Sequence, residues 1–221
     1  MTSVVICGQR SFGRAVFNDL HGDADIAAVV SPAVDDRGRP DRLTAAATGS
    51  GVPWIDADQF SPTDVPDCDV LVAAHSHAYI GRRTRARAHV AVGYHPSLLP
   101  RHRGRDAVRW TIHMGDPVTG GTVYHLTDTV DGGPIAAQQH VLIPPGCTVA
   151  ELWHDLLFPL GVSLLRRVVR DAAAGCVARV PQDTRCATWE PSWERAPLHR
   201  PELFELAAVG HVPKITFRDT L

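Results

Sequence analysis

The sequence of 221 residues is almost without lysine, because Lys214 is the only lysine among 22 basic residues. A catalytic lysine that forms a Schiff base, or the lysine of a nucleotide-binding P-loop, requires a characteristic sequence around it. Lys214 has no such surroundings. The sequence therefore argues against both of these mechanisms.

The chain also lacks any CxxC pair, and its five cysteines are scattered: Cys7, Cys68, Cys147, Cys176 and Cys186. An odd number of dispersed cysteines is typical of a reducing compartment, where they serve as small apolar residues. No stretch approaches 18 consecutive apolar residues, and the opening MTSVVICGQRSFG lacks the basic segment of a signal peptide. We therefore expect a cytoplasmic protein that does not engage a membrane.

Neither sign of charge dominates the chain, whose formal net charge is −2 at pH 7. No global field would attract nucleic acid or an anionic membrane. The hydrophobic content of 44% and the charged content of 21% are ordinary for a globular protein. The length, without internal repeats or low-complexity linkers, predicts one domain over residues 1–195 and a C-terminal tail over residues 196–221.

The first half of the sequence alternates short apolar runs with helical patterns. Strands are expected over 3–7, 25–30, 69–74 and 89–94, and helices over 9–20, 43–47 and 80–88. Continuously apolar strands that alternate with helices are typical of a parallel sheet. The predicted fold is therefore α/β and Rossmann-like, with a mainly parallel sheet and flanking helices.

The pattern changes in the second half. The segments GGTVYHLTD and PIAAQQHVLI are separated by TVDGG, which predicts an antiparallel hairpin at the edge of the sheet. Thr148 and Glu151 have the spacing of a capping box, which would open a helix of about two dozen residues. Pro159 should kink that helix because proline has no amide donor. After Gly175 the chain is irregular, with a short helix expected near residues 201–208.

Two polar turns follow predicted strands. The stretch GQRSFG, from Gly8 to Gly13, suits an anion at a helix N-terminus, but its glycine pattern is incomplete for a dinucleotide site. His75-Ser76-His77 lies at the carboxyl end of a strand, where α/β sheets place ligands. Two histidines need a further ligand to hold zinc, and no other histidine has the spacing for it. We therefore prefer a tight turn and a loop that lines a pocket, without a metal.

His95 lies at the end of a predicted strand, in VGYHPSLLPRHRG. A histidine there is a candidate general base or orienting group, or else a core histidine that bonds a backbone carbonyl. Asp131 lies in DTVDGGPI, where it is either a catalytic partner or an ordinary turn aspartate before glycines. The two residues together carry more information than either one alone.

HPSLLPRHRG, the tryptophan-bearing helix behind it and GGTVYHLTDTVDGGPI together resemble the folate-dependent formyltransferases. This family includes glycinamide ribonucleotide formyltransferase, methionyl-tRNA formyltransferase and the N-terminal hydrolase domain of 10-formyltetrahydrofolate dehydrogenase. The spacing of His95 and Asp131 matches the family's catalytic pair. The motifs are most similar to the hydrolase domain, which shares YHPSLLPRHRG, a GQxxFG-type turn, an LFPxG break and an ATYE-like segment, here CATWEP. The likeness extends from Met1 to about Glu194.

The resemblance implies a substrate and a set of site residues. The one-carbon donor would be 10-formyltetrahydrofolate, with transfer of its formyl group to a small amine or to water. His95 would lie beside the formyl carbon, Asp131 would orient it or relay the proton, and Ser97 would brace the loop. The folate would be held by His75, Ser76, His77, Ala78, Tyr79, Ile80 and Asp128.

Gly93 is the point at which this sequence departs from the family pattern. Most formyltransferases have an asparagine two residues before the histidine, which donates a hydrogen bond to the formyl oxygen. Losing one oxyanion donor typically lowers the rate by about a hundred- to a thousandfold. Either another group replaces that donor, or the substrate is a form without a carbonyl, such as 5,10-methylenetetrahydrofolate. Gly93 would also leave room for a bulkier acceptor or a water.

A non-catalytic folate-binding module is the alternative class, but such a module would be expected to have lost His95 and Asp131. The expected partner is a small-molecule substrate. Nucleic acid is not expected, because the net charge is slightly negative and no basic RNA-binding domain is evident. The acceptor, the choice between transfer and hydrolysis, and the oligomeric state, with a homodimer among the options, stay open.

Overall fold

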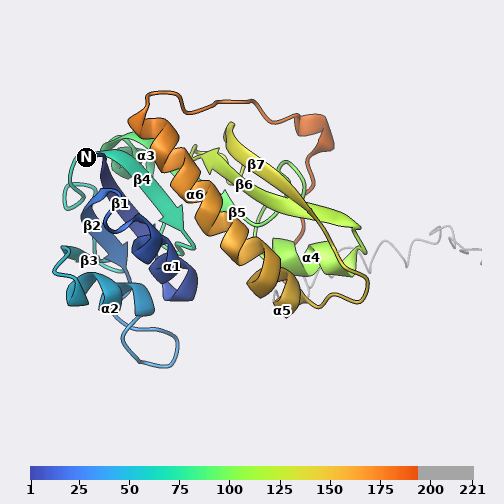
Figure 1. Cartoon of the computed structure of the whole chain (residues 1–221), viewed down its shortest axis with the longest axis horizontal. Coiled ribbons are helices and arrows are strands. Elements are labelled where there is room, and N and C mark those ends of the chain that lie inside the picture. The colour runs from blue at the N-terminus through green and yellow to red at the C-terminus, as the bar shows by residue number, and fades with distance from the viewer. Residues whose placement is uncertain (194–221) are drawn as a thin grey trace, which may run out of the picture.

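The structure is a computed structural model that describes residues 1–193 of the chain (Figure 1). The tail predicted over residues 196–221 and the helix expected near residues 201–208 lie outside the described residues. The division of the chain at residue 195 therefore stays a prediction.

The described residues form one sheet of seven strands in the order β3-β2-β1-β4-β5-β6-β7. The strands are β1 Ser3–Gly8, β2 Asp25–Ser31, β3 Trp54–Asp56, β4 Cys68–Ala74, β5 Ala88–His95, β6 Val118–His125 and β7 Ile135–Leu142. Strands β1 to β5 pair in parallel, whereas β6 pairs antiparallel with both β5 and β7. The predicted mainly parallel sheet with an antiparallel edge is confirmed.

Helices cover this sheet on both faces. They are α1 Arg10–Leu20, α2 Arg42–Gly49, α3 Arg82–Arg85, α4 Ala107–His113, α5 Val149–Glu151 and α6 Phe158–Ala173. In Figure 1, α1 and α6 lie together across one face, where α6 contacts α1 as well as strands β4 to β7. The continuously apolar strands of the sequence follow from this arrangement, because each central strand is buried on both faces.

Alternate residues of β1 show the two apolar layers. Val4 and Ile6 join the cluster beneath α1 and α6, whereas Val5 and Cys7 join the cluster on the opposite face. All four residues are at most 1% exposed. Burial of each aliphatic side chain contributes about 1.5–3 kcal/mol to folding, so the parallel half of the sheet is a stable base for the loops at its edge.

Three elements differ from the sequence predictions. The predicted helix over residues 80–88 is limited to Arg82–Arg85, because Ala88 already pairs with Cys68 as the start of β5. Strand β3 was not predicted, since its three residues are too short to give a periodic pattern. The capping box of Thr148 and Glu151 is confirmed, and a π-helical stretch, Leu152–Leu157, precedes Pro159. The missing amide of Pro159 accounts for the irregular turn before it.

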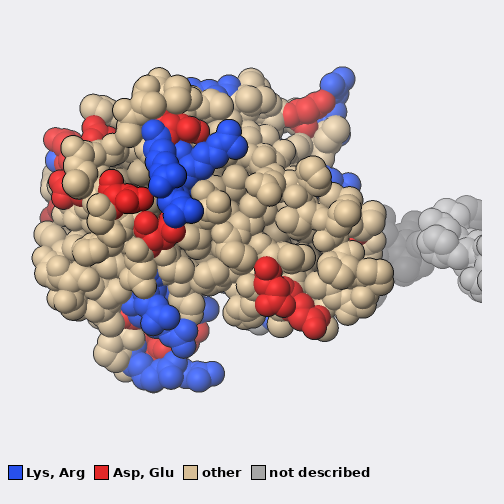
Figure 2. Space-filling model, in the orientation of Figure 1, with Lys and Arg blue, Asp and Glu red and all other residues tan. Residues whose placement is uncertain are grey.

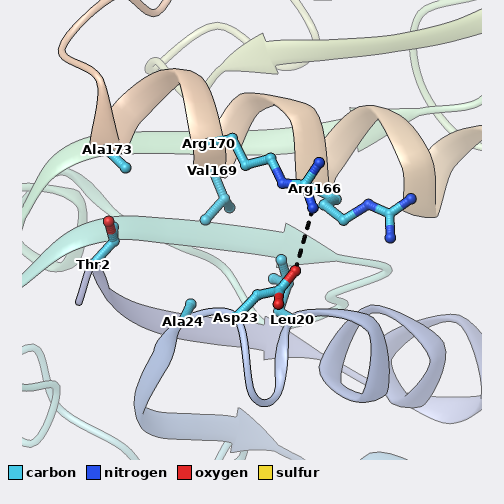
Figure 3. A pocket seen from close by; sticks show the side chains of 8 residues that line it. All are labelled: Thr2, Leu20, Asp23, Ala24, Arg166, Val169, Arg170 and Ala173. Carbon is cyan, nitrogen blue, oxygen red and sulfur yellow. Dashed lines mark hydrogen bonds and ion pairs between the residues drawn. The ribbon is translucent and has the colours of Figure 1, made fainter.

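The face seen in Figure 2 carries basic and acidic side chains in small neighbouring groups rather than one field of a single sign. Arg166 bonds Asp19 at 3.1 Å and Arg170 bonds Asp23 at 3.3 Å, so α6 is joined to α1 and the turn after it. Figure 3 shows the pocket beside Arg166 and the pair of Arg170 and Asp23, a cavity of about 280 Å³ that is also lined by Thr2 and Ala24. Because Thr2 and Ala24 precede β1 and β2, this pocket lies at the amino-terminal edge of the sheet, remote from the loops that follow β4 and β5.

No helix among residues 1–193 is both long enough and apolar enough to cross a membrane.

Candidate active site

The end of β5 places His95 on the face of the sheet opposite α1 and α6. Its neighbour Tyr94 points to the helical face, where its ring stacks on Phe12 with centroids 5.3 Å apart. Because successive side chains of a strand point to opposite faces, Gly93 and His95 share the other face. The antiparallel partner β6 aligns Tyr124 with Gly93 and Thr122 with His95, so these four residues form one surface.

His95 and Asp131 lie next to each other in this surface. His95 Nδ1 is 3.6 Å from Asp131 Oδ2, and the two residues are 6% and 8% exposed. His95 Nε2 donates a hydrogen bond to the backbone carbonyl of His102 at 2.6 Å. Since this bond keeps a proton on Nε2, Nδ1 is the nitrogen that can accept and release a proton. When it does so, the resulting imidazolium faces the Asp131 carboxylate.

Three donors fix Asp131 in place. The hydroxyl of Tyr124 donates to Asp131 Oδ1 at 2.6 Å, and the amide of Gly104 donates to Oδ2 at 2.7 Å. Gln182 donates to the backbone carbonyl of Asp131 at 2.8 Å. Asp131 itself has a φ of 50°, in the left-handed region that aspartate tolerates better than most residues. The turn between β6 and β7 therefore presents its carboxylate to His95 in one orientation.

The loop after His95 is braced from within. Ser97 is fully buried and donates to the carbonyl of Arg101 at 2.6 Å. Thr122 on β6 donates to the carbonyl of Ser97 at 2.7 Å and accepts from the amide of Leu99 at 3.1 Å. The structure thus places Ser97 inside the loop, with its hydroxyl engaged by the loop backbone.

A buried histidine behind this loop lies between two carboxylates. The side chain of His102 is 2% exposed, and its Nε2 is 2.8 Å from Asp116 Oδ2. Its Nδ1 lies 3.2 Å from Glu190 Oε1, an ion-pair distance without the alignment of a hydrogen bond. The amide of His102 donates to Thr188 at 2.8 Å. The segment around residues 188–190 therefore holds the residue whose carbonyl orients His95.

The predicted folate loop after β4 is more open. His77 Nδ1 lies 3.1 Å from the side-chain nitrogen of Gln9, and the rings of His75 and His77 meet edge to face at 5.2 Å. Although part of the residue faces solvent, desolvation of the ring lowers the pKa of His75 to about 4, with smaller contributions from His77 and Arg10. Desolvation likewise lowers the pKa of His77. Both rings are therefore suited to accept hydrogen bonds as neutral groups at pH 7.

The remaining predicted folate residues occupy the rim of this loop. Ser76 donates to the carbonyl of Ala78 at 3.1 Å, and Tyr79 is 78% exposed. Arg85 donates to the carbonyl of Ile80 at 2.8 Å and pairs with Asp128. The structure thus connects Asp128 to the loop after β4 through the guanidinium of Arg85.

The side-chain position of Gly93 is not open. A Cβ added there would lie 3.0 Å from Leu126 Cδ2 and 3.6 Å from Tyr124 Cε1. The room that the sequence suggested for a bulkier acceptor or a water is therefore occupied by the side chains of Leu126, Ala73 and Tyr124. Among residues 1–193, no group of three or more His, Cys, Asp or Glu residues is arranged to hold a metal ion.

Six polar residues that support the site were not predicted from the sequence: Asp116, Thr122, Tyr124, Gln182, Thr188 and Glu190. Their contacts depend on strand register and on long-range packing, which a single sequence does not encode locally. Of the six, Thr188 and Glu190 had a signal, because they belong to the CATWEP segment that marks the resemblance.

Comparison with known proteins shows the family to which the chain belongs. The family model described as formyl transferase matches residues 1–168. The chain is 32% identical over 200 residues to the cytosolic 10-formyltetrahydrofolate dehydrogenase of Xenopus laevis, which covers 85% of this chain and 22% of that protein. It is 27% identical over 209 residues to a methionyl-tRNA formyltransferase of Lactobacillus delbrueckii subsp. bulgaricus, with 89% of this chain and 66% of that protein covered.

Solved structures share the fold. An N-formyltransferase from Helicobacter canadensis, in complex with folinic acid and dTDP-3-aminofucose, superposes with a TM-score of 0.74 at 14% identity, and 90% of this chain and 74% of that chain are covered. At such identity the likeness concerns the fold alone. The chain spans about a fifth of the length of the dehydrogenase that it matches.

Proposed function

The chain belongs to the formyltransferase family, and from this premise we propose that it is a folate-dependent enzyme that uses 10-formyltetrahydrofolate. The observation that carries the proposal is the buried pair of His95 and Asp131, with 3.6 Å between Nδ1 and Oδ2. A non-catalytic folate-binding protein has no need for a base and a carboxylate held in this way. We assign the activity to the domain predicted over residues 1–195.

His95 acts as the general base in this proposal. The attacking amine or water transfers a proton to Nδ1 as it bonds to the formyl carbon, and the charge of the tetrahedral intermediate gathers on the formyl oxygen. Asp131 stabilises the imidazolium that results. On collapse the carbon–nitrogen bond to the folate breaks, and the proton returns from Nδ1 to the departing nitrogen. The products are tetrahydrofolate and either a formylated amine or formate.

The folate is held, in our proposal, by the loop His75–Ile80 together with Asp128. The backbone of such a loop offers donors and acceptors to the amide-like edge of a pteridine. His75 and His77 remain neutral beside it because desolvation lowers the pKa of both side chains. Folinic acid in the Helicobacter canadensis relative supports a folate ligand for this fold.

The acceptor is a small molecule in this proposal, either an amine or water. The near-complete burial of His95 and Asp131 favours an acceptor that is small at its reacting end. The five cysteines are unpaired in the structure, which supports a cytoplasmic setting for the reaction.

The fate of a labelled formyl carbon tests the proposal. The protein is incubated with 10-formyltetrahydrofolate carrying carbon-13 in the formyl group, alone and with a panel of small amines, and the label is followed by NMR. We expect label in formate or in a formylated amine, with release of tetrahydrofolate. His95→Gln should lower the rate by at least about a hundredfold, because the base is lost.

The matched control is His140→Gln, which alters an exposed histidine on β7 and should leave the rate unchanged. A label that stays on the folate under every condition would overturn the proposal. If turnover occurs only with 5,10-methylenetetrahydrofolate, the formyl donor is wrong, and the lack of a side-chain donor at Gly93 gains a direct explanation.

A further inference from the structure

Tyr124 is the one polar residue among the three whose atoms lie nearest to the side-chain position of Gly93. It lies directly opposite Gly93 in the ladder of β5 and β6, and it is 9% exposed. Its hydroxyl donates to Asp131 Oδ1 at 2.6 Å, a short bond to a carboxylate. Burial and the charge of Asp131 raise the pKa of Tyr124 well above its ordinary value, so the phenol stays protonated and remains a donor.

Glycine at position 93 is explained by side-chain room. Gly93 does not have the left-handed backbone that favours glycine elsewhere in the chain. A Cβ at this position would instead approach Leu126 Cδ2 to 3.0 Å and Tyr124 Cε1 to 3.6 Å. A longer side chain would therefore displace the phenol from Asp131 or push Leu126 aside. The absence of a side chain at Gly93 therefore leaves room for the Tyr124 ring on the neighbouring strand.

We propose that Tyr124 is a positioning residue of the active site, which holds Asp131 as a carboxylate that faces His95. The inference rests on the proposed function. With Oδ1 bonded by Tyr124 and Oδ2 by the amide of Gly104, the carboxylate cannot rotate, and its Oδ2 stays beside Nδ1 of His95. A donor to a carboxylate also stabilises its negative charge, so the Tyr124 hydroxyl supports the counter-charge that faces His95.

The groups that face this carboxylate come from three further elements. His95 approaches from β5, and the amide of Gly104 approaches from the loop after it. Gln182 bonds the backbone of Asp131 and is itself bonded by Arg103 at 2.7 Å, which brings a positive charge to the far side of the turn. The groups that donate directly to the carboxylate oxygens of Asp131 are the Tyr124 hydroxyl and the Gly104 amide.

Tyr124→Phe tests the proposal because it removes the hydroxyl and retains the ring. The rate of 10-formyltetrahydrofolate consumption is measured against pH. We expect the acid limb of the profile, which belongs to the His95–Asp131 pair as a unit, to move to higher pH. The sign follows from the lost donor: a carboxylate without it holds its proton more strongly.

Tyr94→Phe is the matched control. Tyr94 is a partly buried tyrosine of the neighbouring strand, and its hydroxyl donates to the carbonyl of Leu157 at 2.7 Å on the opposite face. This variant should show the wild-type acid limb. An acid limb that does not move in Tyr124→Phe, whatever its rate, would overturn the positioning role, because a purely structural loss lowers the rate at every pH alike.

Two further measurements test the positioning role of Tyr124. The titration of the Asp131 carboxyl carbon by NMR needs no turnover, and it should show a higher pKa in Tyr124→Phe than in the wild type. If that shift is present and 10-formyltetrahydrofolate is not consumed, the proposed function fails and the positioning role stands. A fluorinated tyrosine at position 124 keeps the fold and is a stronger donor, so the acid limb should move to lower pH; movement to higher pH would contradict the role.

Discussion

Two neighbouring loops at the carboxyl edge of the sheet differ in how firmly they are held. Both follow parallel strands, β4 and β5, and both contain a histidine with left-handed backbone, His75 with a φ of 61° and His102 with a φ of 53°. The side chain of His102 is buried between Asp116 and Glu190, whereas His75 meets His77 and faces solvent in part.

The difference agrees with the role that each loop has in the proposed function. The loop after β5 carries His95, and a misplacement of the base of about 1 Å would cost a large factor in rate. It is therefore tied to β6, to Asp116 and to the segment around residues 188–190. The loop after β4 is the one proposed to admit the folate, and its side chains are more accessible, with Tyr79 exposed. The more firmly held of the two loops is therefore the one that carries the proposed base.

Glu190→Gln should loosen the firmly held loop. The substitution removes the charge 3.2 Å from Nδ1 of His102, and so weakens the support of the carbonyl that orients His95. We expect the free energy of unfolding to fall by about 2 kcal/mol and the turnover rate to fall by about tenfold, because the buried carboxylate beside His102 is lost. Denaturant unfolding and the formyl-consumption assay measure the two effects.

Glu151→Gln is the control for that variant. Glu151 also stabilises local structure, as part of the exposed capping box of α5, but it lies outside the site. Its loss should lower stability less than the loss of Glu190 does and leave turnover unchanged. Equal turnover in Glu190→Gln and the wild type would show that the segment around residues 188–190 does not support the base.

His75→Asn should have the smaller effect, on the dependence of stability on pH. In the folded state the pKa of His75 is about 4, against 6.5 for the free side chain. Between these values the unfolded chain binds the proton more readily, so this residue costs no stability above pH 6.5 and destabilises the fold as the pH falls toward 4. The midpoint of thermal unfolding should therefore drop less between pH 7 and pH 4 in the variant than in the wild type.

Asparagine suits the left-handed backbone of residue 75, so the substitution tests the charge rather than the conformation. His140→Asn, on exposed β7, serves as the control and should follow the wild type. If the midpoint of thermal unfolding drops equally in His75→Asn and the wild type, the ring of His75 is freely solvated. The difference between the two loops would then include no electrostatic effect at His75.

Much of this arrangement could be predicted from the sequence because it depends on local patterns. The continuous apolar runs that end at Gly8, Ala74 and His95 predicted parallel strands, and parallel strands bring their carboxyl ends to one edge. His95 and the loop that begins at His75 accordingly lie at the same edge. The spacing of Thr148 and Glu151 predicted the start of the long helix for an equally local reason.

The supports of the site could not be predicted in this way. Tyr124 reads as an ordinary strand residue, and only the register of β5 against β6 places it opposite Gly93. The contact of His102 with Thr188 joins residues that are 86 positions apart, a separation over which no periodicity carries information. The space at Gly93 was misjudged for the same reason, since a glycine in a sequence does not reveal which neighbours fill its side-chain position.

The most direct test of the central claim compares binding and turnover in Asp131→Asn. Folinic acid serves as the ligand for affinity, and single-turnover consumption of 10-formyltetrahydrofolate gives the rate of the chemical step. We predict wild-type folding, an affinity within about threefold of the wild type, and a rate lower by about three to four orders of magnitude, because the imidazolium loses its counter-charge. A variant that binds folinic acid normally and turns over at a near-wild-type rate would show that the His95–Asp131 pair is not the catalytic centre.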